Sequence, residues 1–159
     1  MNRFVANFTM RLDSKGRVSI PGSFRSVLAR DGFEGLYCYP ALDRPAIDAG
    51  GSALMAEIEN LIGRYPPFSD QREQLALALY GTSETPKIDG EGRVALSDDL
   101  KRHAGITEMV AFVGLGHKFQ IWDFGHFQKE LAEATEKVRE LKGELSSQVA
   151  ARKALGARE

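Results

Sequence analysis

Cysteine is nearly absent from this sequence, and long apolar runs are absent altogether. Its one cysteine, Cys38, excludes an intrachain disulfide and a metal cluster made of cysteines alone. The setting Tyr37-Cys38-Tyr39 favours a small buried thiol, as expected in a reducing compartment. No window approaches the roughly 20 apolar residues of a membrane span, and the first residues lack the apolar core of a signal peptide. We therefore expect a cytoplasmic protein with no membrane partner.

The residue patterns of common enzymes are missing too. The sequence has neither the Gly-x-Ser-x-Gly motif of hydrolases nor the Gly-x-x-x-x-Gly-Lys-Ser/Thr loop that holds phosphates. The histidines lie far apart, without the His-x-x-x-His spacing of a zinc site: His103, His117 and His126. Four acidic residues could be imagined as a Mg²⁺ or acid–base site: Asp89, Glu91, Asp98 and Asp99. These acids already have structural roles in a tight loop and in the first turn of a helix. We therefore expect no catalytic residue, metal, cofactor or small-molecule substrate.

The net charge of −1 does not suggest a nucleic-acid binder, but the charges are unevenly distributed. Residues 1–30 contain six cations and one anion: Arg3, Arg11, Asp13, Lys15, Arg17, Arg25 and Arg30. Residues 84–103 contain four cations and five anions, which a solvated surface explains. For the first segment a phosphate-facing surface competes with that interpretation, because clustered Lys and Arg release counterions from DNA.

One stretch of the chain occurs twice. A shift of 76 residues places Asp13 opposite Asp89. Over the fifteen aligned positions, Arg11–Arg25 and Lys87–Lys101 share nine identical or chemically similar pairs, including the Asp, Gly, Arg and Val of both copies. A period of this length is too long for a solenoid repeat and indicates a duplicated half-domain.

Each copy has the sequence of a tight hairpin loop, in which three residues ending in glycine separate Asp from Arg. Gly16 takes the loop position that requires φ > 0, and the Asp can accept hydrogen bonds from backbone N–H groups two or three residues on. Because side chains alternate along a strand, Arg17 points outward if Val18 points inward. Each copy is therefore expected to present one arginine on a rigid turn. Pairing of that arginine with its own aspartate and binding to a ligand are compatible roles.

These turns resemble those of the MraZ family of bacterial transcriptional regulators, whose halves are AbrB/MazE-like (SpoVT-AbrB) domains. The resemblance rests on both Asp-x-x-x-Arg turns and on three stretches of sequence: Phe8–Arg25, Gly81–Arg93 and Lys118–Asp123. It extends from about residue 3 to about residue 140. Two such turns, each opening its own half and followed by matching sequence, form a specific signal where one turn would be weak.

The resemblance implies an α+β fold of two tandem AbrB/MazE-like half-domains, which form an intrachain pseudo-twofold unit of short strands with flanking helices. It also implies a sequence-specific, nucleoid-associated regulator that forms homo-oligomeric rings of about eight or more subunits. Such proteins bind tandem short repeats of double-stranded DNA upstream of the division and cell-wall gene cluster. In that family the turns form the DNA surface, which carries over here to Asp13, Arg17, Asp89 and Arg93.

Charge and position add three further candidates for the DNA surface. Lys15 lies within the first turn, where it could bind phosphate, whereas its counterpart in the second turn is Glu91. Arg11 and Arg25 lie on either side of the first turn and are expected to bind phosphates as well. The first copy is therefore predicted to dominate the affinity for DNA.

Hydrophobic periodicity predicts the remaining elements. Helices are expected after Pro21, over 54–61, from Ser69 or Asp70 to Tyr80, after Ser97, and from Phe124 or Gly125 onward. Strands are expected over 36–39, around Ile47, over 108–113 and over 118–122. Aromatic residues of these strands are expected to fill the core rather than stack on bases: Tyr37, Tyr39, Phe112, Phe119 and Trp122.

The predicted domain boundaries follow from these elements. Residues 5–52 and 81–124 form the two AbrB-like domains, 53–80 a helical connector, and 125–159 a C-terminal helix with a frayed tail after about residue 150. The last helix carries an apolar stripe with spacings of three and four: Phe127, Leu131, Ala134, Val138, Leu141 and Leu145. This stripe could dock on its own half or on a neighbouring subunit.

An antitoxin-like protein-interaction module is the alternative function, in which the same fold serves to inhibit another protein. Such antitoxins usually carry one AbrB unit and a long inhibitory tail. Here the two copies of the turn and the short tail favour the DNA-binding regulator.

Overall fold

The computed structural model describes residues 2–156, which form two compact units. The first unit extends to Phe124 and contains the strands of the described chain. The second unit begins at Gly125 and consists of one long helix. Within residues 2–156, no helix combines the length and the apolar character that a membrane span requires.

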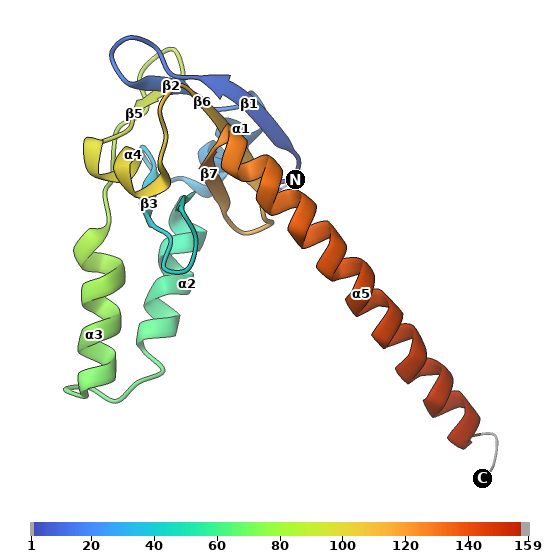
Figure 1. Ribbon diagram of the computed structural model, residues 1–159. Coiled ribbons are helices and arrows are strands. Elements are labelled where there is room, and N and C mark those ends of the chain that lie inside the picture. The colour runs from blue at the N-terminus through green and yellow to red at the C-terminus, as the bar shows by residue number, and fades with distance from the viewer. Residues whose placement is uncertain (1, 157–159) are drawn as a thin grey trace. The chain divides into compact units, whose positions relative to one another are not determined.

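The strands of the first unit are short, and their order in space differs from their order in the chain. They are β1 (Asn7–Arg11), β2 (Arg17–Ser19), β3 (Tyr37–Pro40), β4 (Ala46–Gly50), β5 (Arg93–Ala95), β6 (Met109–Gly114) and β7 (Phe119–Asp123). An antiparallel five-stranded sheet has the order β1-β6-β7-β4-β3, while β2 and β5 pair separately (Figure 1). Strand β1 thus pairs with β6, from the other half of the sequence, with Thr9 opposite Ala111.

Helices connect and cover these strands. They are α1 (Gly22–Asp31), α2 (Ser52–Ile62), α3 (Asp70–Leu79), the 3₁₀ helix η1 (Tyr80–Thr82), α4 (Asp98–Ala104) and α5 (Phe124–Gly156). The predicted helix starts after Pro21 and Ser97 are confirmed, and the Ser97 hydroxyl accepts a hydrogen bond from the N–H of Leu100. Helices α2 and α3 form a hairpin (Figure 1). The helix predicted from Ser69 or Asp70 to Tyr80 corresponds to α3, which ends at Leu79 and is followed directly by η1.

Phe24 of α1 lies at the centre of the main core and is 1% exposed. Its ring contacts four other aromatic rings, with centroid distances of 5.0 to 6.4 Å: Phe4, Phe8, Phe112 and Phe119. Each such aromatic pair contributes about 0.5–1.5 kcal/mol beyond the burial of its area. This packing holds α1 on the sheet, so the turn that precedes α1 has a rigid support.

Strand residues that the sequence assigned to the core are buried. All five strand aromatics are at most 4% exposed, which confirms their predicted role: Tyr37, Tyr39, Phe112, Phe119 and Trp122. Cys38 is fully buried, and this burial raises the pKa of its thiol to about 12, as expected of an inert core cysteine. A second apolar cluster, which includes Leu54, Ile58 and Leu79, packs α2 and α3 on β3.

The α+β class expected from the sequence is confirmed, with antiparallel sheets and helices as in an AbrB/MazE-like fold. The predicted strands over 36–39, around Ile47, over 108–113 and over 118–122 correspond to β3, β4, β6 and β7, displaced by no more than one residue where ends were predicted. A prediction of this quality is possible because each strand carries an apolar run bounded by turn residues.

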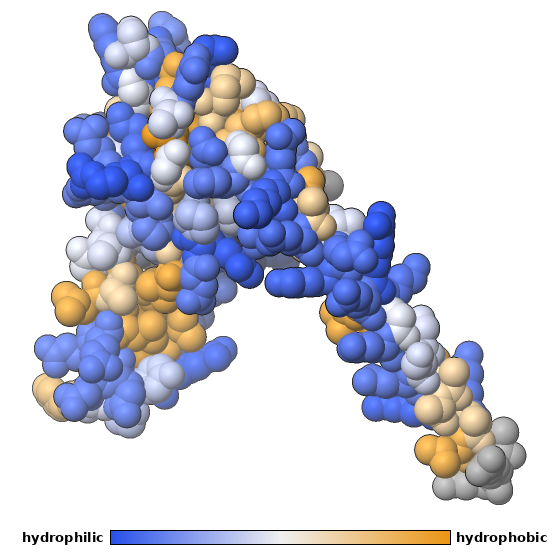
Figure 2. All heavy atoms as spheres, in the orientation of Figure 1, coloured by the Kyte–Doolittle hydropathy of each residue, from blue (hydrophilic) through white to orange (hydrophobic). Residues whose placement is uncertain are grey.

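The second unit is helical over all of its described length, since α5 extends to Gly156. The sequence predicts a frayed tail after about residue 150, so the helix is longer than expected; residues 157–159 lie outside the described part. Four large residues of the apolar stripe are 48% to 61% exposed: Leu131, Val138, Leu141 and Leu145. Figure 2 shows apolar side chains, in orange and pale orange, among the hydrophilic ones along α5.

Candidate nucleic-acid interface

One aspartate holds the first turn together. Oδ1 of Asp13 accepts hydrogen bonds from the backbone N–H groups of Lys15 and Arg17, at 2.9 and 2.8 Å. The backbone closes the loop, because the Asp13 N–H donates to the Arg17 carbonyl and the Gly16 N–H donates to the Asp13 carbonyl, at 2.8 and 3.1 Å. Gly16 has a φ of 75°, the left-handed conformation that the sequence predicts. The hydrogen bond from the Arg17 N–H is the main reason why the pKa of Asp13 lies below its ordinary value.

The other carboxylate oxygen of Asp13 orients the arginine. Nε of Arg17 donates to Oδ2 of Asp13 at 2.8 Å, and the Arg17 side chain is 30% exposed. Within residues 2–156, no hydrogen bond or ion pair engages the two terminal nitrogens of Arg17. Both roles considered for this arginine are therefore compatible with the geometry: Nε is paired with the turn aspartate, while the outer edge of the guanidinium group is available.

The second turn repeats these contacts. Oδ1 of Asp89 accepts from the N–H groups of Glu91 and Arg93, each at 2.9 Å, and Nε of Arg93 donates to Oδ2 at 3.0 Å. Gly92 has a φ of 80°. The side-chain hydrogen bond with Asp89 raises the pKa of Arg93, and the N–H of Arg93 is the main cause that lowers the pKa of Asp89.

The second turn differs in the availability of its arginine. Oε2 of Glu91 lies 3.4 Å from Nη1 of Arg93, so one terminal nitrogen already faces an acid. In the first turn the equivalent position holds Lys15, whose charge adds to that of Arg17. The first turn is consequently the more cationic of the two.

Pairing of β2 with β5 brings the two turns together. Val18 lies opposite Val94, and both are 1% exposed. Because side chains alternate along strands, Arg17 and Arg93 lie on the outer face of this two-stranded ribbon. Two matching hydrogen bonds extend the pairing: the Ile20 N–H donates to the Gly92 carbonyl at 2.9 Å, and the Leu96 N–H donates to the Gly16 carbonyl at 3.2 Å.

One basic residue of α1 and one of α4 lie beside the turn of the opposite copy. A Cβ added to Gly92 would lie 2.6 Å from Nη1 of Arg25, and one added to Gly16 would lie 3.2 Å from Nζ of Lys101. Arg25, which precedes the second turn by many residues in the chain, therefore lies beside that turn. Lys101, which was not a predicted site residue, adds a cation to the first turn. Its alignment with Arg25 in the repeat is the signal that could have identified it.

Arg11 has an acidic partner outside the two turns. It is the last residue of β1, and its Nη1 pairs with Oε1 of Glu108. Both side chains are largely exposed, so the pair is a surface ion pair of small net energy that a phosphate can replace.

The acidic residues considered as a catalytic or metal site each lie beside a cation. Asp89 and Glu91 face Arg93, while Asp98 pairs with Lys101 at 3.4 Å and Asp99 with Arg102 at 2.9 Å. Among residues 2–156, no group of three or more His, Cys, Asp or Glu side chains is arranged to hold a metal ion. The structural explanation given for these acids from the sequence accounts for their positions.

Two of the histidines, His103 and His117, have separate partners. Nε2 of His103 lies 3.1 Å from the carbonyl oxygen of Arg44, and Nε2 of His117 lies 3.0 Å from Oε2 of Glu57. His117, in the turn between β6 and β7, thus has an acidic partner on α2.

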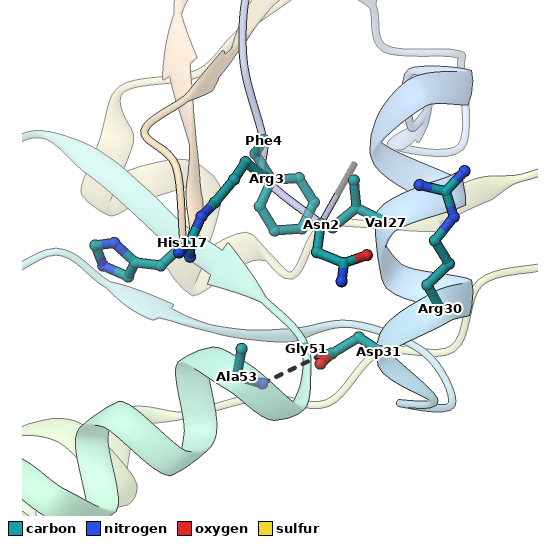
Figure 3. A pocket seen from close by; sticks show the side chains of 9 residues that line it. All are labelled: Asn2, Arg3, Phe4, Val27, Arg30, Asp31, Gly51, Ala53 and His117. Atoms are coloured by element: carbon teal, nitrogen blue, oxygen red, sulfur yellow. Dashed lines mark hydrogen bonds between the residues drawn. The ribbon is translucent and has the colours of Figure 1, made fainter.

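A pocket lies between the N-terminal segment, α1 and the start of α2 (Figure 3). Asp31 projects into it and accepts a hydrogen bond from the Ala53 N–H at 3.2 Å, which satisfies a donor of the first turn of α2. Gly51 lets this carboxylate approach, since a Cβ there would lie 2.2 Å from Oδ2 of Asp31. The pocket thus has a structural explanation, and neither Asp-x-x-x-Arg turn lines it.

Comparison with known proteins gives a consistent result. Residues 79–145 match a family described as "MraZ protein, putative antitoxin-like". A transcriptional regulator MraZ from Xanthobacter autotrophicus is 63% identical over 147 residues, which cover 92% of this chain and 94% of the relative. The transcriptional regulator MraZ of Azorhizobium caulinodans is 61% identical with the same coverage, and that of Rhizobium meliloti is 41% identical over 86% of this chain and 93% of the relative.

Proposed function

The chain belongs to the MraZ family of transcriptional regulators, and we propose that it acts by sequence-specific binding of double-stranded DNA through its two Asp-x-x-x-Arg turns. The observation that carries the proposal is the pairing of β2 with β5. This pairing places Arg17 and Arg93 on one outer face, where a single duplex can reach both. No catalytic step is part of the proposed function.

Arg17 is the residue proposed to read bases. Its planar guanidinium group matches the O6 and N7 acceptors of guanine in the major groove, and it also fits a phosphate. The bond from Nε to Asp13 fixes the plane of the group while its terminal nitrogens point to the ligand. Because the side chain is ordered before binding, it loses less conformational entropy when it meets DNA. Arg93 and Asp89 take the same roles in the second turn.

The surrounding cations are proposed to hold phosphates. Lys15 lies in the first turn, and the position of Lys101 beside Gly16 places a second ammonium group there. Arg25 would supply the corresponding charge to the second turn. Arg11 would contribute once a phosphate displaces Glu108.

Repetition of the turns supports binding to tandem short repeats. In this proposal residues 5–52 and 81–124 are AbrB-like domains, 53–80 connects them, and several copies of the chain assemble in a homo-oligomeric ring of about eight or more subunits. Tethered weak contacts give avidity that one subunit lacks, which suits a chain of net charge −1. The proposed site of action is the nucleoid of the cytoplasm, at a promoter upstream of the division and cell-wall gene cluster.

A binding selection on random double-stranded DNA tests this function. Wild-type protein should enrich a repeated short motif, whereas a variant with both Arg17→Ala and Arg93→Ala should enrich none. The mass of both proteins in solution should be the same multiple of the 17.5 kDa chain, which shows that the loss is not one of assembly. Recovery of no motif by the wild type, or of the same motif by the variant, would reject the turns as the DNA surface.

The family description also supports the antitoxin-like alternative, in which the chain binds and inhibits another protein. Purification of the chain from its own cells distinguishes the two functions. A stoichiometric protein partner whose release leaves DNA binding unchanged would favour the alternative.

A further inference from the structure

Residues 125–156, the described part of the second unit, form a helix with large apolar side chains that are exposed. The core-type positions of a heptad fall on Leu131, Ala134, Val138, Leu141 and Leu145, and Gln148 takes the next such position. The large members of this set expose about half of their surface. Positions with a repeat of seven along one helix face form the seam of a two-stranded coiled coil. The surface is therefore suited to a second amphipathic helix.

The charged residues beside this apolar surface indicate which helix binds to it and whether that helix is parallel or antiparallel. Lys137 and Glu144 directly precede two of the core positions, where residues of paired helices meet across the seam. Neither makes an ion pair with another residue of the described chain. Since the two are seven residues apart, about 10 Å along the axis, they cannot satisfy one another within one helix.

We propose that α5 pairs in antiparallel orientation with α5 of a second copy of this chain. In this arrangement Val138 packs on the partner's Leu141, and Ala134 packs on the partner's Leu145, so a small residue meets a large one. Lys137 then faces the partner's Glu144, and symmetry gives the reciprocal pair. Every charge that flanks the centre of the seam has a partner of opposite sign or a neutral neighbour.

Competing arrangements bring like charges together. A parallel pair places Lys137 next to the partner's Lys142, again twice by symmetry. Shifting the antiparallel pair by seven residues in one direction places Lys137 opposite the partner's Lys137. A shift in the other direction places Glu144 opposite the partner's Glu144. The sequence of α5 thus specifies one direction and one register.

This inference rests on the self-association that is part of the proposed function, but it does not involve the DNA-binding turns. The pairing can join neighbouring subunits of one assembly or two assemblies. In either case the contact is made through the helix rather than through the strands of the first unit.

Cross-linking of the full-length chain tests the direction. Leu131 and Gln148 lie at opposite ends of the seam, about 25 Å apart on one helix, and they meet across the pair only if the helices are antiparallel. The variants Leu131→Cys and Gln148→Cys should cross-link with a short bis-maleimide when they are mixed, and neither should cross-link with itself. Wild type, whose Cys38 is buried, is the control and should not react.

Charge reversal tests the register. Lys137→Glu should lower the cross-linked fraction of the mixture roughly tenfold at low salt, because two attractive pairs become repulsive. The double change Lys137→Glu with Glu144→Lys should restore it. A variant that only lost helix content would not be rescued, and Glu136→Lys, on the outer face, is the matched control that should have little effect.

Three results would overturn the proposal: self-cross-linking of each cysteine variant, absence of any cross-link, or failure of the double reversal to restore the yield. The mass of wild type in solution separates this failure from that of the proposed function. An oligomer without the mixed cross-link rejects the helix pairing alone, whereas a monomer rejects self-association as well.

Discussion

The two Asp-x-x-x-Arg turns share their backbone hydrogen bonds and differ at two loop positions, where Ser14 and Lys15 of the first turn lie opposite Gly90 and Glu91 of the second. In each, one carboxylate accepts two backbone N–H groups and the arginine Nε at 2.8 to 3.0 Å. In the first turn the middle residue Lys15 adds charge, while in the second turn Glu91 lies 3.4 Å from Nη1 of its arginine. Identical local geometry therefore supports two surfaces of different electrostatic potential. The backbone therefore positions the arginine of each turn, and the side chains beside the arginine determine how strongly it attracts an anion.

Removal of each arginine should give the largest effect and test the comparison directly. Arg17→Ala should cost about 1–3 kcal/mol of binding free energy per contacted site and relax the sequence preference, because the guanidinium group proposed to contact a base is lost. Arg93→Ala should cost less, since one of its terminal nitrogens faces Glu91. Fluorescence anisotropy with the selected DNA measures both.

Two further variants control this measurement. Arg17→Lys keeps the charge but lacks the planar guanidinium group, so the variant should keep much of the affinity for random DNA and lose the sequence preference. Arg102→Ala removes a cation of α4 that pairs with Asp99 and should change little. Equal losses of DNA affinity for Arg17→Ala and Arg93→Ala would show that the difference in charge between the turns does not affect DNA binding.

Substitution of the turn glycines should break both turns by a similar amount. Gly16→Ala and Gly92→Ala force a non-glycine residue into the left-handed region, at a cost of about 1–2 kcal/mol each in the free energy of unfolding. Gly90→Ala, in the second turn, meets open space and has no positive φ, so it should be near neutral. Denaturant unfolding of the three variants measures these costs.

The glycine variants also sharpen the difference between the turns. A Cβ at Gly92 meets the flexible end of Arg25 and displaces it, whereas a Cβ at Gly16 lies farther from Lys101. Gly92→Ala should therefore disturb a phosphate-binding cation as well as the backbone. Equal stability of Gly92→Ala and Gly90→Ala would contradict the argument from backbone conformation.

Exchange of the middle residues Lys15 and Glu91 should exchange the charges of the two turns. Glu91→Lys should strengthen binding to random DNA and steepen the dependence on salt by about 0.9 in the logarithmic slope per added phosphate contact, while Lys15→Glu should do the opposite. The measurement is the affinity over a range of salt concentrations. Parallel salt plots for both variants and wild type would reject a phosphate role at these positions.

Acid should act on the two turns alike, and only at low pH. Backbone N–H groups lower the pKa of Asp13 and Asp89 below the ordinary value of 3.8. A lowered pKa in the folded state means that the ionised carboxylates support the turns above the ordinary value and lose this role as the pH falls through the lowered one. NMR titration of the side-chain carboxyl carbons should place both midpoints below 3.8, and a midpoint above it in either turn would show that its hydrogen bonds are weak.

Local sequence was sufficient to predict the turns. Asp13 and Gly16 determine the loop through hydrogen bonds and a φ value that involve only neighbouring residues, so the pattern could be interpreted without the fold. The strands and most helix starts were predicted for the same reason, because apolar alternation and a serine N-cap act over a few residues.

Contacts between distant segments could not be derived in this way. The sequence placed Arg25 with the first turn, since the two are close in the chain, but the pairing of β2 with β5 brings it to the second. The same crossing adds Lys101 to the first turn. Arg11 is expected from the sequence to bind phosphate, and only the fold shows Glu108 beside it.

By itself, then, the sequence determined the shape of each turn, the residues of the core and the apolar stripe of α5, because each depends on short-range geometry or on the periodicity of one element. The tertiary structure decided which cations surround each arginine and that both arginines share one face. These features arise where strands far apart in the chain form hydrogen bonds, and such pairing depends on the packing of the whole unit.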